Sequence, residues 1–256
     1  MTAVQGNSID IPTSDGVADA YVAYPDDGAA YPGVLMYTDV FGLRGLVRDM
    51  ADRLASSGYT VLVPNVYYRL GRAPVIISPD EIAPDDLARH IFQVIMPQIS
   101  ALTPELVMRD ARAYLDWLAA SGHTAGRPVG VTGYCMGVPL MMHTAGTYPG
   151  RIAAGAGFHG GFLATAAPNS PHLLAGAITA ELYFGHADKD EALPPEQIER
   201  LNKALDSAGV RYRAEVYAGA PHGYTQADFA RFDRFDAAAT ERHWRELVTL
   251  FGRTLS

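Results

Sequence analysis

A cysteine between two glycines is the strongest candidate for chemistry in this sequence. Cys135 lies in Gly-Tyr-Cys-Met-Gly (133–137), after an apolar run at 129–132 that predicts a strand and before residues 136–147, which predict a helix. This is the pattern of a nucleophile elbow, with a thiol in place of the usual serine hydroxyl. N–H groups at a helix N-terminus stabilise a thiolate. The alternative is a buried structural cysteine, which is a common fate for a lone Cys.

A thiol nucleophile needs a base, and His222 is the best placed of the eight histidines. It lies in Gly-Ala-Pro-His-Gly (219–223), a turn that follows a predicted strand at 211–217. The order nucleophile, acid, histidine along the chain is common among hydrolases with such an elbow. His90 and His243 fall within predicted helices, and we expect them to be solvated or half-buried.

The acid that orients the histidine should lie between them, after a strand. Residues 181–184 predict that strand, and two aspartates follow it in the loop, Asp188 and Asp190. Asp188 is favoured because it stands three residues past Gly185, the glycine that should end the strand; Asp190 is the alternative. The sequence has neither the HExxH motif of zinc proteases nor a phosphate-binding GxxxxGK[ST] loop, so we expect no metal and no cofactor.

The elements that must position these residues alternate between strands and helices. Strands are predicted at 34–37, 59–63, 129–132, 152–157, 181–184 and 211–217, and helices at 48–57, from Thr103 onward, 136–147, 194–208 and near the C-terminus. Such alternation favours one α/β domain over residues 1–256, with a mostly parallel sheet and helices on both faces. Residues 72–100 fit the pattern least and are predicted to form a cap-like segment.

Composition excludes several classes of protein. The chain has 256 residues, a net charge of −8, 48% hydrophobic residues and one cysteine, which argues against a disordered chain and a disulfide scaffold. An acidic chain without a basic block is a poor ligand for nucleic acid or anionic membranes. Residues 1–12 are polar and lack the apolar core of a secretory signal, so we expect a cytoplasmic protein, monomeric or weakly homo-oligomeric.

With elbow, acid and histidine in order, residues 17–251 resemble the dienelactone hydrolase (carboxymethylenebutenolidase) family of the α/β-hydrolase superfamily. The Gly-Tyr-Cys-Met-Gly motif is more specific than a generic elbow, because most α/β-hydrolases use serine. The resemblance implies an α/β-hydrolase fold and a triad of Cys135, His222 and Asp188. It also implies hydrolysis of a small-molecule lactone or ester through a thioester.

The resemblance extends to the oxyanion hole. Asp-Val-Phe-Gly (39–42) occupies the place of the family's Glu-x-Phe-Gly, in which the glutamate meets the resting cysteine. By resemblance, Asp39 reaches the thiol directly or through water, although it is one methylene shorter. The N–H groups of Val40 and Met136 would then bind the oxyanion.

A second stretch carries the expected substrate contact. Pro-Asn-Val-Tyr-Tyr-Arg (64–69) is similar to the family's Pro-Asp-Leu-Tyr-x-Arg, so Arg69 is expected to bind an anionic group of the substrate. The alternative for Arg69 is an ordinary surface charge.

Two departures put the family's namesake substrate in doubt. Gln226 stands where the family has a second substrate arginine, and Val138 stands where a glycine is usual after the elbow. Loss of one charged hydrogen bond would weaken carboxylate binding by about 1–3 kcal/mol. The alternatives are therefore a general carboxylesterase or thioesterase of the same family, or a non-catalytic redox-sensing or binding protein that uses Cys135.

Overall fold

The computed structural model describes residues 3–255, and its centre is one twisted sheet. Within these residues eight strands form the sheet in the order β1-β2-β4-β3-β5-β6-β7-β8. The strands are β1 (Val4–Thr13), β2 (Gly16–Pro25), β3 (Tyr31–Tyr37), β4 (Thr60–Pro64), β5 (Thr124–Tyr134), β6 (Ile152–Phe158), β7 (Glu181–Ala187) and β8 (Tyr212–Tyr217). All pairings from β4 to β8 are parallel, which confirms the predicted, mostly parallel α/β sheet.

The first two strands were not predicted from the sequence. They form an antiparallel hairpin, and β2 continues the sheet by pairing with β4, also antiparallel. Strand β1 is mostly polar and partly exposed, so it lacks the apolar run by which the central strands are recognised. The hairpin turn uses Gly16 at a φ of 142°, a conformation that favours glycine.

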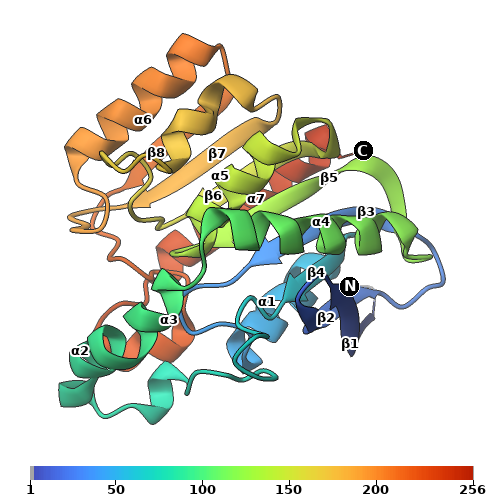
Figure 1. Cartoon of the computed structure of the whole chain (residues 1–256), viewed down its shortest axis with the longest axis horizontal. Coiled ribbons are helices and arrows are strands. Elements are labelled where there is room, and N and C mark those ends of the chain that lie inside the picture. The colour runs from blue at the N-terminus through green and yellow to red at the C-terminus, as the bar shows by residue number, and fades with distance from the viewer. Residues whose placement is uncertain (1–2, 256) are drawn as a thin grey trace.

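Helices cover both faces of the sheet (Figure 1). Among the described residues the α-helices are α1 (Gly45–Ala55), α2 (Leu87–His90), α3 (Met96–Ser100), α4 (Pro104–Ala120), α5 (Gly137–Thr147), α6 (Pro195–Ala208) and α7 (Ala237–Thr254). Helices α1 and α7 pack into one apolar cluster, with side chains such as Leu54 and Leu247. Helices α4, α5 and α6 pack into the cluster on the other face, with side chains such as Tyr114, Met141 and Leu201.

The segment that fits the alternation least is a chain of short helical turns. Two 3-10 turns, Pro79–Glu81 and Pro84–Asp86, lead into α2, a π-helical turn at Ile91–Ile95 and then α3. In Figure 1, α2 and α3 lie at one end of the molecule, apart from the sheet. No single helix within residues 3–255 has both the length and the hydropathy of a membrane span; one bent pair, Pro84–Ser100 with Pro104–Ala120, meets these criteria together.

The candidate residues all follow the carboxyl ends of parallel strands. Asp39 and Val40 follow β3, Cys135 follows β5, the two candidate aspartates follow β7, and His222 follows β8. Because parallel strands end at one edge of a sheet, loops from distant parts of the chain converge there.

Candidate active site

Cys135 lies in a strained turn between β5 and α5. Its φ is 51°, a left-handed value that is uncommon for a residue with a side chain. The turn is tight because a Cβ on Gly133 would lie 2.1 Å from the carbonyl oxygen of Gly137, and one on Gly137 would lie 2.7 Å from the carbonyl oxygens of Tyr37 and Thr38. The thiol is half-buried and lines a cavity, so it is not a sealed structural cysteine.

The structure brings His222 between the thiol and a carboxylate. His222 Nε2 lies 3.1 Å from Cys135 Sγ, and His222 Nδ1 lies 2.6 Å from Asp190 Oδ2. The side chain of Asp190 is 3% exposed, and its other oxygen accepts the N–H of Ala192 at 2.9 Å. A buried, hydrogen-bonded carboxylate of this kind fixes the ring orientation and stabilises the imidazolium.

The preference for Asp188 as the partner of His222 was wrong. Strand β7 does not end at Gly185 but continues to Ala187, because residues 185–187 pair with β8. Asp190, rather than Asp188, is therefore the aspartate three residues past the strand. Asp188 instead accepts the N–H of Gly219 at 2.8 Å, which ties the loop after β7 to the turn that carries His222.

The protonation of His222 follows from its neighbours. Burial by itself would lower the pKa of His222, but the Cys135 sulfur and the Asp190 carboxylate beside its two ring nitrogens raise that pKa to about 10. The charged form of the imidazole is therefore favoured. The pair is suited to nucleophilic attack by sulfur.

A second histidine, which the sequence analysis missed, lies against this ring. His159 follows β6 with a φ of 41° and is fully buried. Its Nε2 lies 2.7 Å from the Thr225 hydroxyl, and its ring meets that of His222 edge to face at 5.5 Å. Burial and the nearby charge of His222 lower the pKa of His159 well below its usual range, so it stays neutral. The only local signal was the position of His159 two residues past a predicted strand.

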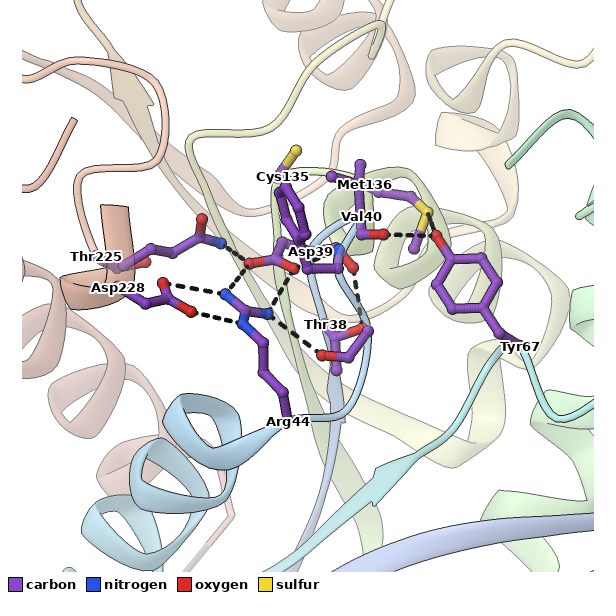
Figure 2. A network of polar contacts seen from close by, with 12 residues as sticks. Thr38, Asp39, Val40, Arg44, Tyr67, Cys135, Met136, Thr225 and Asp228 are labelled. Carbon is purple, nitrogen blue, oxygen red and sulfur yellow. Dashed lines mark hydrogen bonds and ion pairs between the residues drawn. The ribbon is translucent and has the colours of Figure 1, made fainter. Parts of the chain in front are cut away.

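Val40 and Met136 are the two residues expected to supply an oxyanion hole. Both residues line the cavity together with Cys135. Within residues 3–255, neither backbone N–H is engaged by a protein acceptor. The Tyr67 hydroxyl donates to the Val40 carbonyl at 2.9 Å and lies 3.4 Å from Met136 Sδ, so it joins the two segments (Figure 2).

Asp39 does not meet the thiol. Figure 2 shows its carboxylate inside a buried network with Arg44, whose guanidinium donates to both Asp39 oxygens at 2.8 Å. Asp39 also accepts the Phe41 N–H at 2.8 Å and the Gln226 amide N–H. No hydrogen bond joins Asp39 to Cys135 in the described part of the chain, so the expected direct contact with the thiol is not made, whereas a contact through water stays a prediction.

The same network explains Gln226 and adds a second acid. Arg44 Nε donates to Asp228 Oδ2 at 2.6 Å, so one guanidinium serves two buried carboxylates. Gln226 is 4% exposed and serves this network as a donor. Gln226 therefore helps to hold the loop after β3 in place, through its hydrogen bond to Asp39.

Arg69 is bound by acidic side chains of the protein itself. Its guanidinium makes a forked contact with Asp110 at 2.8 and 3.0 Å and a second contact with Asp15 at 2.7 Å. It stacks on the Tyr68 ring at 4.5 Å and is not among the residues that line the cavity at Cys135. Because two carboxylates already occupy the guanidinium, the structure favours an ion-pairing role for Arg69, and the expected contact with a substrate anion stays a prediction.

Val138, the other departure, fills space that two glycines leave open. A Cβ on Gly160 would lie 2.6 Å from Val138 Cβ, and one on Gly157 would lie 2.4 Å from Val138 Cγ1. The valine therefore packs behind the elbow against backbone that has no side chains, and it leaves the cavity at Cys135 unobstructed.

The cavity in front of Cys135 has a volume of about 360 Å³ and is mostly apolar. Its described lining contains no Lys, Arg, Asp or Glu side chain. The polar side chains that line it are Cys135, His222, His143 and Asn169; apolar ones include Val40, Met96, Ile99, Leu102, Met136 and Leu140. Met96 and Ile99 come from α3, so the segment of short helices forms one wall.

A wider groove of about 820 Å³ lies on the other side of His222. It runs between Leu87 and Phe92 of the short helices and the loop that carries Asp188 and Asp190. His222 therefore lines both the groove and the cavity at Cys135. Within residues 3–255, no group of three or more His, Cys, Asp or Glu side chains is arranged to hold a metal ion.

Known proteins are similar in sequence to this chain over nearly its whole length. A protein of Methylorubrum extorquens with the provisional name carboxymethylenebutenolidase is 26% identical over 246 residues, which cover 95% of this chain and 79% of that protein. Protein usf of Aquifex pyrophilus is 26% identical over 239 residues, which cover 92% of this chain and 93% of its own.

Solved structures share the fold. A crystal structure from Klebsiella pneumoniae, provisionally titled a dienelactone hydrolase, has a TM-score of 0.83 at 23% identity and covers 98% of this chain and 100% of its own. A dienelactone hydrolase from Anabaena variabilis has a TM-score of 0.68 at 14% identity, with coverage of 99% of both chains. These similarities confirm the α/β-hydrolase fold.

The model of the family described as "Dienelactone hydrolase family" matches residues 18–255. This range includes the elbow, the aspartate loop and the histidine turn. The chain therefore belongs to the dienelactone hydrolase family and is a hydrolase of carboxylic esters or lactones.

Proposed function

We propose that the protein hydrolyses a carboxylic ester or lactone with Cys135 as nucleophile, His222 as acid and base, and Asp190 as the residue that orients His222. The observation that carries this proposal is the alignment of Sγ, Nε2, Nδ1 and Oδ2 through contacts of 3.1 and 2.6 Å. A thiol that only senses oxidants or binds a partner needs neither an aligned imidazole nor an oxyanion hole. The alignment therefore favours hydrolysis.

The first half of the reaction forms a thioester. The Cys135 thiolate attacks the carbonyl carbon, a C–S bond forms, and the N–H groups of Val40 and Met136 hold the oxyanion. The tetrahedral intermediate collapses and the ester C–O bond breaks. The leaving oxygen takes the proton from His222 Nε2, so His222 becomes neutral.

Water completes the cycle. Neutral His222 removes a proton from water, and the hydroxide attacks the thioester carbonyl. The C–S bond breaks and restores the thiolate beside a protonated His222. The released carboxylic acid ionises in solvent, so the net change is addition of one water across the ester bond.

The test compares three variants on p-nitrophenyl acetate and on a simple lactone. Cys135→Ala is expected to abolish turnover. Asp190→Asn should lower kcat by roughly 100-fold or more, the usual range for loss of a working acid–base group. Asp188→Asn is the matched control, because an asparagine oxygen still accepts the Gly219 N–H, and it should cost far less. Retained activity in Cys135→Ala, or a larger loss in Asp188→Asn than in Asp190→Asn, would refute the assignment.

A further inference from the structure

One histidine of the cavity has no role in the proposed triad. His143 is 8% exposed, lines the same cavity as Cys135, and has no hydrogen-bond partner within the described chain. Burial lowers its pKa, so the imidazole is neutral and able to donate or accept one hydrogen bond toward the cavity.

The helix sets the distance between His143 and the nucleophile. Met136, Leu140 and His143 are spaced by four and three residues at the start of and along α5, so they share one face of the helix, and all three line the cavity. Seven residues of rise place the backbone of His143 roughly 10 Å from that of Met136, and helical side chains lean back toward the N-terminus. The imidazole therefore lies at the distance of a medium-length acyl chain from the thiol.

The cavity lining between the thiol and His143 disfavours a charged group on the substrate. Ile99, Leu102 and Leu140 supply apolar surface, and the described lining contains no Lys or Arg side chain; its charged imidazole, His222, stands beside the thiol. The resemblance implies two positions that bind a substrate carboxylate, and neither is available for it. Arg69 is paired with two acids, and the second position holds Gln226, which donates to Asp39. The Glu105 carboxylate acts electrostatically on His143, which further disfavours a second anion there.

We propose that this cavity is an acyl-binding site for an uncharged, medium-length chain with a hydrogen-bonding oxygen near its far end, which His143 recognises. This inference rests on the proposed function, because the chain is fixed by attack of Cys135 on its carbonyl. His143 is a specificity-determining residue in this arrangement, and it takes no part in bond making.

The experiment uses p-nitrophenyl esters of similar length that differ at the far end. Heptanoate ends in a methyl group, 6-oxoheptanoate places a neutral ketone oxygen on the sixth carbon, and the adipate monoester places a carboxylate there. Wild type should prefer the ketone over heptanoate in kcat/KM by roughly three- to tenfold, the value of one hydrogen bond, and should hydrolyse the adipate ester most slowly. His143→Leu should remove the preference for the ketone and raise KM more than it lowers kcat. His123→Leu, at an exposed histidine outside the cavity, should keep it.

The acetate ester separates the two levels of the proposal, because it is too short to reach residue 143. If wild type shows no Cys135-dependent turnover of acetate, the proposed function fails. If acetate is hydrolysed but the adipate ester is the best of the longer substrates, or the ketone preference survives in His143→Leu, the acyl-site inference is overturned while the triad stands.

Discussion

His222 is the residue whose chemistry depends most on its exact neighbours. Its raised pKa of about 10 means that the proton stays on the ring at neutral pH. This protonation stabilises the folded state fully at pH values below the ordinary histidine pKa of 6.5, and the stabilisation is lost as the pH rises through about 10.

Replacing Asp190 tests the origin of this shift. Asp190→Asn removes the negative charge beside Nδ1, so the pKa of His222 should fall well below 10, and the stabilisation should disappear at a lower pH. An NMR titration of the His222 ring in wild type and both asparagine variants measures this. Equal titration curves for Asp190→Asn and Asp188→Asn would contradict the assignment.

Tyr67 contacts both residues of the proposed oxyanion hole, Val40 and Met136. Burial, together with the nearby Asp39 and Cys135, raises the pKa of Tyr67 far above its usual range, so the hydroxyl remains a donor to the Val40 carbonyl. Tyr67→Phe should lower kcat roughly tenfold with little change in KM, less than the 100-fold or more that loss of an oxyanion donor costs.

The neighbouring tyrosine provides the control for this prediction. The Tyr68 hydroxyl contacts Thr13 and Asp110, and Tyr68 is not among the residues lining the cavity. Tyr68→Phe should therefore leave the kcat of acetate hydrolysis near the wild-type value. Steady-state kinetics compare kcat of Tyr67→Phe with kcat of Tyr68→Phe. A similar loss of kcat in each would show that Tyr67 has only a structural role.

At the scale of elements, the loop from β3 to α1 is held by one buried cation. Arg44 is 4% exposed and neutralises Asp39 and Asp228, the second of which lies in a 3-10 turn at Ala227–Phe232. The two acids come from distant parts of the chain, so the arginine joins the N-terminal half of the site to the C-terminal half.

Loss of the Arg44 guanidinium should destabilise the folded state. Arg44→Met leaves two largely buried carboxylates without their ion-pair partner and should lower the free energy of unfolding by about 3–5 kcal/mol. Arg53→Met is the control, because the Arg53–Glu241 pair is about half exposed on both sides and contributes little. Urea unfolding measures both variants, and equal losses would contradict a buried network.

At the scale of the molecule, Arg69 connects three segments that are distant in sequence. It follows β4 and pairs with Asp15 in the β1–β2 turn and with Asp110 on α4. The N-terminal hairpin, the sheet and a covering helix are therefore joined by one side chain, and the side chain of Asp110 is 4% exposed.

This role predicts a loss of stability without a change in specificity. Arg69→Met should lower the free energy of unfolding by about 1–3 kcal/mol, because Asp110 loses a charged hydrogen bond. The ratio of kcat/KM for the adipate monoester and heptanoate should not change. A selective loss with the anionic ester would restore the substrate role that the resemblance implied.

Local sequence was enough to find Cys135 and His222. The turn at 133–137 requires glycines within a few residues of the cysteine, and the helix after it begins at once, so the elbow is encoded in contiguous residues. The alternation of strands and helices was predictable for the same reason, because each central strand is an apolar run of its own. The hairpin of β1 and β2 was missed because its first strand is polar.

The hydrogen-bond and ion-pair partners of the predicted site residues depend on the tertiary structure. Asp190 replaced Asp188 because pairing with β8 extends β7 by three residues, and no residue near Asp188 indicates this. Asp39 and Arg69 carry charges suited to the predicted site, yet both are bound by side chains distant in sequence. Gln226 lies 187 residues from Asp39, and Asp110 lies 41 residues from Arg69. Local sequence determines the conformation of a turn, whereas the pairing of a charge depends on which distant acid or base the fold places within hydrogen-bond distance.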